Sequence, residues 1–152
     1  MMTADTRTPA RLRHAPSWLI NLASAHSHRL VSDGFAAAGA RGYHYRLLAA
    51  LDENGPSSQA ALGRRTGIDR SDVVAALNEL AGKNLVERSP DPSDRRRNVI
   101  TLTPDGSRHL NELQEVVDQV QDDLLAALTP SERDQLTDLL TRVIDHHTRS
   151  RP

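Results

Sequence analysis

The chain has 152 residues, of which 3% are aromatic and none is cysteine, and its formal net charge is −1 at pH 7. This length allows one domain with its own core, but so few aromatic residues favour a helical protein that buries leucine and alanine, partly between subunits. The absence of cysteine excludes disulfides, thiolate metal ligands and cysteine-based oxidant sensing, and the charge balance excludes a globally basic nucleic-acid binder.

Residues 1–15 contain threonines, arginines and a proline without apolar periodicity, and we interpret them as a flexible N-terminal arm. No apolar segment follows their arginines, so they lack the form of a secretory signal. The sequence also has no run that approaches the ~20 apolar residues of a membrane-spanning helix. We therefore expect a cytoplasmic protein.

The segment 16–39 predicts a long helix that a proline opens and a glycine ends. Trp18, His26 and Arg29 share one face of this helix, beside a more apolar stripe. Trp18 either packs in an interface between subunits or lobes, or forms the wall of a pocket for a ring-bearing ligand. His26 is open between the same two roles.

The segment 41–54 predicts the second helix, which ends at a glycine-proline pair. We expect Tyr45 to fill a core position. Tyr43 and Arg46 can recognise a carboxylated aromatic molecule, because a ring stacks on tyrosine and a carboxylate pairs with a guanidinium. The alternative for Arg46 is a solvated side chain without a ligand.

Two short helices are predicted next. The segment 57–67 begins with serines that can cap a helix and ends at a glycine suited to the left-handed conformation. Asp69 can cap the second helix, on which Val73, Leu77 and Leu80 form one buried stripe. Two short helices joined by a tight turn predict a helix-turn-helix.

A hairpin follows the second short helix. Two β-prone runs, 85–88 and 98–102, flank a segment that contains two prolines, two aspartates and two serines. Three consecutive arginines, residues 95–97, lie on its return side. They suit an anionic partner, although such a charged loop can also be merely solvated. Residues 41–103 therefore predict a winged helix-turn-helix, with its second helix in the major groove and its hairpin on the backbone or minor groove.

Three segments of the hairpin form a combined signature: LVER at 85–88, DPSDRR at 91–96 and VITLTPDG at 99–106. Together they resemble the wing of MarR-type transcriptional regulators, and the resemblance extends over about residues 18–147. It implies a homodimer on a pseudo-palindromic operator, from which a small, often aromatic and anionic, molecule releases it. It also implies that Arg96 enters the minor groove while Asp94 orients its planar guanidinium.

The exposed face of the helix-turn-helix should read few bases. Asp72 repels phosphate, although it can accept from a cytosine amino group or cap its own helix, and small apolar side chains can touch thymine methyls. Affinity should therefore depend on phosphate contacts and on the wing. The candidate DNA-binding residues are Ser58, Gln59, Arg70, Ser71, Asp72, Val74, Ala75, Asn78, Asp94, Arg95, Arg96 and Arg97.

The segment 104–148 predicts two more helices, capped by Thr103 and by a capping box that starts at Thr129. Each carries an apolar stripe, and a single subunit has little else to cover it. We expect the segments 16–39 and 104–148 to form a dimer; a hairpin of the last two helices within one subunit is the alternative. Residues 58–97 carry eight basic against six acidic side chains, whereas residues 104–152 carry five against ten, so the helical part should face away from DNA.

The predicted fold is thus mainly α with a small β-hairpin, a winged helix-turn-helix flanked by N- and C-terminal dimerisation helices in one domain over residues 16–152. The predicted function is a ligand-responsive, dimeric, DNA-binding transcriptional repressor with no cofactor. The candidate effector-binding residues are Trp18, His26, Arg29, Tyr43 and Arg46.

Two other functions are compatible with parts of the sequence. Seven histidines suggest a zinc- or other metal-responsive regulator as an alternative function. They show no compact spacing with carboxylates, so we predict no metal site. A winged helix can also bind protein in place of DNA, which the arginine-bearing hairpin disfavours. The sequence shows no phosphate-binding glycine loop, nucleophile motif or recognisable pair of catalytic carboxylates, so we predict no enzyme.

Overall fold

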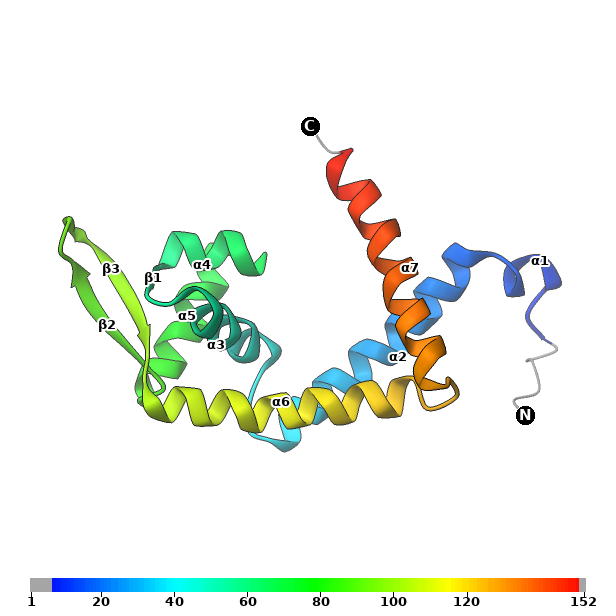
Figure 1. Cartoon of the computed structure of the whole chain (residues 1–152), viewed down its shortest axis with the longest axis horizontal. Helices are drawn as coiled ribbons and strands as arrows, with labels where there is room; N and C mark the ends of the chain where they lie inside the picture. Colours follow the sequence, from blue (N-terminus) through cyan, green and yellow to red (C-terminus); the bar gives the residue numbers. More distant parts are fainter. Residues whose placement is uncertain (1–6, 151–152) are drawn as a thin grey trace.

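The computed structural model describes residues 7–150, which form a mainly helical molecule with one small sheet (Figure 1). This is the predicted fold class. In chain order the elements are α1 (Ala10–Arg13), α2 (Pro16–Ala37), α3 (Gly42–Asn54), β1 (Ser57–Ser58), α4 (Gln59–Thr66), α5 (Arg70–Gly82), β2 (Val86–Asp91), β3 (Asp94–Leu102), α6 (Pro104–Leu124) and α7 (Pro130–Arg149).

Helix α6 connects the two parts of the molecule (Figure 1). Its first half packs against the lobe formed by α3, α4, α5 and the sheet, and α2 packs along its second half. The approach of α2 is close because Gly34 has no side chain: a Cβ there would lie 3.1 Å from both Val116 Cγ1 and Val120 Cγ2. Helix α7 rises from the end of α6 and does not fold back along it, so the alternative of a helical hairpin within one subunit is not formed.

The core of the lobe formed by α3, α4, α5 and the sheet is aliphatic, as the low aromatic content predicts. Its fully buried side chains come from α3, α4, α5, β3 and α6, so one cluster fixes the relative positions of these helices and the wing. These side chains are Leu47, Leu48, Leu51, Leu62, Val73, Leu77, Leu80, Ile100 and Leu113.

Local capping signals set the ends of the helices where the sequence predicts them. Asp69 caps α5, Thr103 Oγ1 accepts from Gly106 N at 2.9 Å to cap α6, and Thr129 forms a capping box with Glu132. Gly67 ends α4 with φ +67°, a conformation that suits glycine. These caps define the turn between the two short helices and the junction of the wing with α6.

The close backbone packing at position 106 explains why the segment that follows the wing has a glycine there. A Cβ at this position would overlap the Leu85 carbonyl oxygen and lie 2.7 Å from Leu102 Cδ1. Only glycine lets the first turn of α6 pack directly on the backbone that leads into β2. The wing is therefore seated on the start of α6 by a backbone contact.

The sheet has three antiparallel strands in the order β1-β3-β2. The hairpin pairs Val86 with Leu102, and β1 joins the other edge of β3 by pairing Ser57 with Ile100. Neither β1 nor α1 was predicted. Helix α1 lies in the segment interpreted as a flexible arm, of which residues 1–6 are outside the described residues.

Two helices expose apolar faces. Leu19, Ile20 and Leu22 of α2 are each nearly half exposed, and Leu139 and Ile144 of α7 are 55% and 61% exposed. No residue of α7, which the structure describes in full, is buried. Among residues 7–150 no helix combines the length and apolar character that crossing a membrane requires.

Candidate nucleic-acid interface

Helix α5 presents one face to the core and the other to solvent. Val73, Ala76, Leu77 and Leu80 are buried, so the remaining side chains form the exposed face. Arg70 and Asn78 are the side chains on it that can form bidentate hydrogen bonds with guanine and adenine, respectively. The exposed positions include the six predicted ones: Arg70, Ser71, Asp72, Val74, Ala75 and Asn78.

The start of α5 is fixed by Asp69. Its Oδ2 accepts from Ser71 Oγ at 2.6 Å and from Ser71 N at 3.3 Å, and these bonds lower the pKa of the Asp69 carboxyl. The Ser71 hydroxyl is therefore engaged at the cap. Asp72 lies in the first turn and its carboxylate makes no hydrogen bond within residues 7–150, so the cap belongs to Asp69.

The start of α4 is less available than predicted. Ser58 Oγ accepts from Ala61 N at 3.1 Å as the N-cap of the helix. Both Ser58 and Gln59 are half-buried. Because the Ser58 hydroxyl is engaged as the cap, the Gln59 side chain is the more available of the two for contact with a phosphate.

The wing holds Arg96 extended on a carboxylate brace. Asp94 Oδ1 accepts from Arg96 N and from Arg96 Nε, each at 3.1 Å, and Asp94 Oδ2 lies 3.7 Å from Arg97 Nε. The bonds from Arg96 lower the pKa of Asp94, so this group stays ionised beside the arginines. The Arg96 side chain is nonetheless 91% exposed. It is oriented by Asp94 and open to an external anion.

The tip of the hairpin is stiffened by a second aspartate. Asp91 Oδ1 accepts from Ser93 N at 2.9 Å and from Ser93 Oγ at 2.8 Å, which lowers the pKa of Asp91. The register shifts between Pro90 and Asp91. Arg95, Arg97 and, on β2, Arg88 are exposed along this hairpin. Arg88 was missed by the sequence analysis, although its place in a strand beside the arginine run could have suggested it.

The five candidate effector residues do not gather in one subunit. Arg46 Cζ lies 5.2 Å from the centre of the Tyr43 ring, so these two do lie together. Trp18, His26 and Arg29 lie on α2, and no hydrogen bond, ion pair or ring contact within residues 7–150 joins them to the first two. The indole N–H of Trp18 has no hydrogen-bond partner in this part of the chain.

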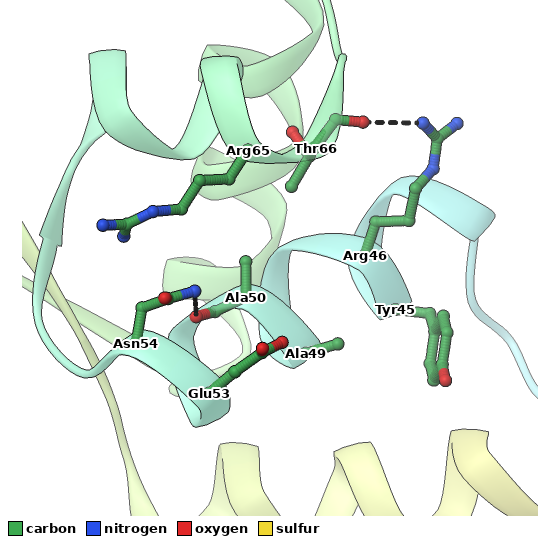
Figure 2. Close-up of a pocket in the computed structure, with 8 residues that line it drawn as sticks. All are labelled: Tyr45, Arg46, Ala49, Ala50, Glu53, Asn54, Arg65 and Thr66. Atoms are coloured by element: carbon green, nitrogen blue, oxygen red, sulfur yellow. Dashed lines mark hydrogen bonds between the residues drawn. The ribbon is translucent and has the colours of Figure 1, made fainter. Parts of the chain in front are cut away.

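Tyr45 lies where the sequence analysis expects it, against the core. Its ring is 5.8 Å from that of Phe35, and its hydroxyl donates to Gln114 Oε1 at 2.7 Å. Tyr45 thereby ties α3 to both α2 and α6. Next to it, a pocket of about 470 Å³ opens between α3 and the end of α4 (Figure 2).

A buried histidine links the start of α3 to α5, and the sequence analysis missed it. His44 Nε2 lies 2.7 Å from Glu79 Oε2, and His44 Nδ1 accepts from Arg41 N at 3.4 Å. The second bond assigns the proton to Nε2, which donates to the carboxylate. Arg41 Nη1 also lies 3.5 Å from Glu79 Oε1. Among residues 7–150 no group of three or more histidines, aspartates or glutamates is placed to hold a metal ion.

The comparisons with known sequences identify transcriptional regulators as relatives of this chain. The model of the MarR family matches residues 39–97. The HTH-type transcriptional repressor NicR of Pseudomonas putida is 35% identical over 98 residues, 64% of this chain and 62% of NicR. A putative transcriptional regulatory protein for the hcr operon of Thauera aromatica is 35% identical over 99 residues, 65% of this chain and 60% of that protein. The chain thus spans about three fifths of the length of these relatives.

Solved structures share the whole arrangement. Bordetella bronchiseptica BpsR, described with a mechanism for regulation of its DNA binding by 6-hydroxynicotinic acid, has a TM-score of 0.76 at 25% identity, over 91% of this chain and 99% of BpsR. The PcaV transcriptional regulator from Streptomyces coelicolor, in complex with its natural ligand, has a TM-score of 0.72 at 27% identity, over 95% and 98%. The chain is therefore a winged helix-turn-helix protein with long flanking helices. The match of residues 39–97 to the family model and the likeness to these regulators support the resemblance to the MarR family that the wing signature predicts.

Proposed function

We propose that this protein is a homodimeric transcriptional repressor of the cytoplasm, which binds a pseudo-palindromic operator and leaves it when a small molecule binds. No catalytic step is part of this function. The observation that carries the proposal is Arg96, which is braced by Asp94 and 91% exposed at the end of a stiff hairpin. A guanidinium held in this way suits the narrow, strongly negative minor groove.

The exposed face of α5 and the arginines of the wing form the proposed DNA surface. Arg70 and Asn78 would read bases in the major groove. Arg95 and Arg97 would contact phosphates beside Arg96. Arg88, which lies on β2 of the same hairpin, would also contact a phosphate. The other side chains of the surface are Gln59, Ser71, Asp72, Val74 and Ala75, with Ser58 beneath them as a cap.

A second copy of the chain is the proposed cover for the apolar faces of α2 and α7. These faces lie at the end of α6 away from the wing (Figure 1). A symmetric dimer formed there would bury both and leave the two wings free. It would present two recognition helices to successive turns of one face of the duplex, which requires a spacing of about 34–36 Å.

The proposed effector is a small molecule, with carboxylated aromatic compounds as its class. The regulation of BpsR by 6-hydroxynicotinic acid supports this class by similarity, and the complex of PcaV with its natural ligand supports an effector in general. Tyr43 and Arg46 would contribute a ring and a cation. Trp18, His26 and Arg29 would take part only in a site that the partner's α2 completes.

The salt dependence of DNA binding tests this function. A fragment selected from genomic DNA would be titrated with the full chain at several salt concentrations, with fluorescence anisotropy as the readout. Three arginines in each wing predict that the logarithm of the affinity falls with that of the salt concentration at a slope between about −3 and −6. Absence of binding even in dilute buffer, or an affinity independent of salt, would show that the lobe does not bind DNA.

A further inference from the structure

The turn between α2 and α3 is bound to the last part of α5 by polar side chains. Glu79 Oε2 lies 2.7 Å from His44 Nε2, and Glu79 Oε1 lies 3.5 Å from Arg41 Nη1. One helical turn later, Lys83 Nζ donates to the Gly39 carbonyl oxygen at 3.4 Å. Glu79 and Lys83 are four residues apart and therefore share one face of α5. These two side chains and their partners, Gly39, Arg41 and His44, form the α5 clamp.

The clamp lies on the side of α5 away from the proposed DNA surface. Glu79 follows Arg70, and Lys83 follows Val74, by about two and a half helical turns. The half turn reverses the direction of a side chain, so Arg70 and Val74 project toward the proposed DNA surface while Glu79 and Lys83 project toward the α2–α3 turn. The clamp therefore acts on the orientation of α5 and not by contact with bases or phosphates.

The turn that the clamp holds is a hydrogen-bonded extension of α2. Gly39 has φ +68°, and Ala40 N donates to the Phe35 carbonyl oxygen at 2.9 Å. Both Phe35 and Ala40 are buried. The backbone therefore leaves α2 in one fixed direction. Because α2 belongs to the proposed dimer, the clamp sets how the recognition helix of each subunit is oriented relative to the dimer.

His44 is the member of the clamp that can change its charge near neutral pH. Its neutral ring accepts from Arg41 N through Nδ1 at 3.4 Å and donates to Glu79 through Nε2. A protonated ring carries a hydrogen on both nitrogens, so its Nδ1–H would face the Arg41 N–H and the bond at the start of α3 would be lost. The charged groups that face the ring are Glu79, which favours the proton, and Lys83 and Arg41, which oppose it.

The ring stays neutral at pH 7 because it is buried. His44 is 3% exposed, and burial is the main cause that lowers its pKa below the ordinary 6.5. A proton therefore enters the folded chain only when the pH falls below this value. The protonated ring, Arg41 and Lys83 then place three positive charges around the carboxylate of Glu79, which balances only one of them.

We propose that Glu79 and Lys83 are positioning residues for operator recognition, and that protonation of His44 opens the clamp and weakens DNA binding in mild acid. The inference rests on the proposed function, because it concerns the orientation in which α5 meets DNA. It assigns to the lobe itself a response to pH that is independent of any small molecule.

The DNA affinity of Glu79→Ala tests the positioning role. By charge alone, removal of an acidic side chain should strengthen binding to DNA, whereas loss of the clamp should weaken it. We expect fluorescence anisotropy to show a loss of about tenfold, as for one hydrogen bond to a charged group. The matched control is Glu53→Ala, which removes an exposed carboxylate from α3 and should bind DNA as well as the wild type or better. Lys83→Met should also weaken binding, and Lys83→Arg should retain it, because a guanidinium can donate to the Gly39 carbonyl oxygen.

The pH profile of DNA binding tests the protonation step. Between pH 7.5 and 5.5 the affinity of the wild type should fall by about tenfold, which corresponds to a coupling of one pKa unit. His44→Gln should lack this fall, because an amide does not titrate, whereas His109→Gln, on α6 and outside the clamp, should keep it. Circular dichroism and sedimentation at each pH check that the fold and the assembly are unchanged.

Three results would each overturn the inference while DNA is still bound at pH 7.5. They are equal affinities of Glu79→Ala and Glu53→Ala, a wild-type affinity that does not fall with pH, and the same pH profile for His44→Gln and His109→Gln. If Glu79→Ala does not fold, the pH profiles alone decide. Failure of the wild type to bind DNA at pH 7.5 overturns the proposed function instead.

Discussion

Arg96 combines two properties that rarely occur together, a fixed guanidinium and almost full exposure. We expect Arg96→Ala to weaken DNA binding by about 1 kcal/mol or more, as for the loss of a good groove contact. The DNA affinity of Arg96→Lys should lie between that of the wild type and that of Arg96→Ala, because an ammonium keeps the charge but lacks the planar fork of the guanidinium. Gel-shift titration measures both, with Arg149→Ala on α7 as a control outside the wing. An unchanged affinity in Arg96→Ala would remove this side chain from the DNA surface.

His44 supports α5 from inside the lobe through Glu79. His44→Ala should lower the free energy of unfolding by about 1–3 kcal/mol, because a buried contact is lost and Glu79 keeps only Arg41 as a partner. Chemical denaturation near neutral pH measures this loss. A change within experimental error would mean that the bond to Glu79 contributes nothing to stability.

The same histidine makes stability depend on pH. Burial lowers the pKa of His44 below the ordinary 6.5, against the opposing effect of Glu79 and with smaller effects of Lys83 and Arg41. The unfolded chain then binds the proton more readily, so the contribution is complete above pH 6.5 and is lost as pH falls below it. We expect the stability difference between wild type and His44→Gln to shrink between pH 7.5 and 5. A constant difference would contradict the neutral state of the buried ring.

Gly106 shows how one position can fix the junction of two elements. Gly106→Ala should cost about 2 kcal/mol or more of unfolding free energy, because the new methyl group meets the Leu85 backbone, which cannot move aside as a flexible side chain can. Gly82→Ala is the matched control: nothing lies within 4 Å of its Cβ position, and it lies at the end of a helix. That change should be neutral or stabilising by about 0.5–1 kcal/mol. Urea denaturation distinguishes the two, and equal stabilities would refute the packing argument.

The helices and the wing could be predicted from the sequence because their signals are local. Asp69, Thr103 and Gly67 act on neighbouring backbone groups, so their effect is visible in a few residues. Strand β1 could not be predicted, since two serines have little β-propensity and form a strand only because β3 lies beside them. The bond from His44 to Glu79 spans 35 residues and likewise depends on the finished fold.

The candidate site divides in the same way. The exposed face of α5 follows from its buried stripe, and the pairing of Asp94 with Arg96 follows from residues two apart. Only part of the lining of the pocket beside Arg46 could be predicted from the sequence, because Thr66 and Arg65 come from another helix. Grouping Trp18 with Tyr43 assumed a proximity that one subunit does not provide, since about 30 Å of helix separates the start of α2, where Trp18 lies, from its end.

The apolar face of α7 makes a prediction about assembly. Leu139→Glu combined with Ile144→Glu should shift the proposed dimer to monomer in sedimentation experiments, because the charges would be buried at the interface. DNA affinity should fall by about 100-fold, since two linked half-sites bind at a high local concentration. Asp138→Lys, on the opposite face by helical period, is the control. A wild type that sediments as a single subunit would contradict the dimer itself.

Helix α6 runs from the wing to the far end of the molecule without a break, over 21 residues. Such a rod is about 30 Å long, and a tilt of roughly 6° at one end displaces the other by about 3 Å, close to the rise of one base pair. A rotation too small to disturb any core contact could therefore move each wing out of step with the duplex by a full base pair. Loss of DNA binding then requires only a small tilt of α6 and no unfolding.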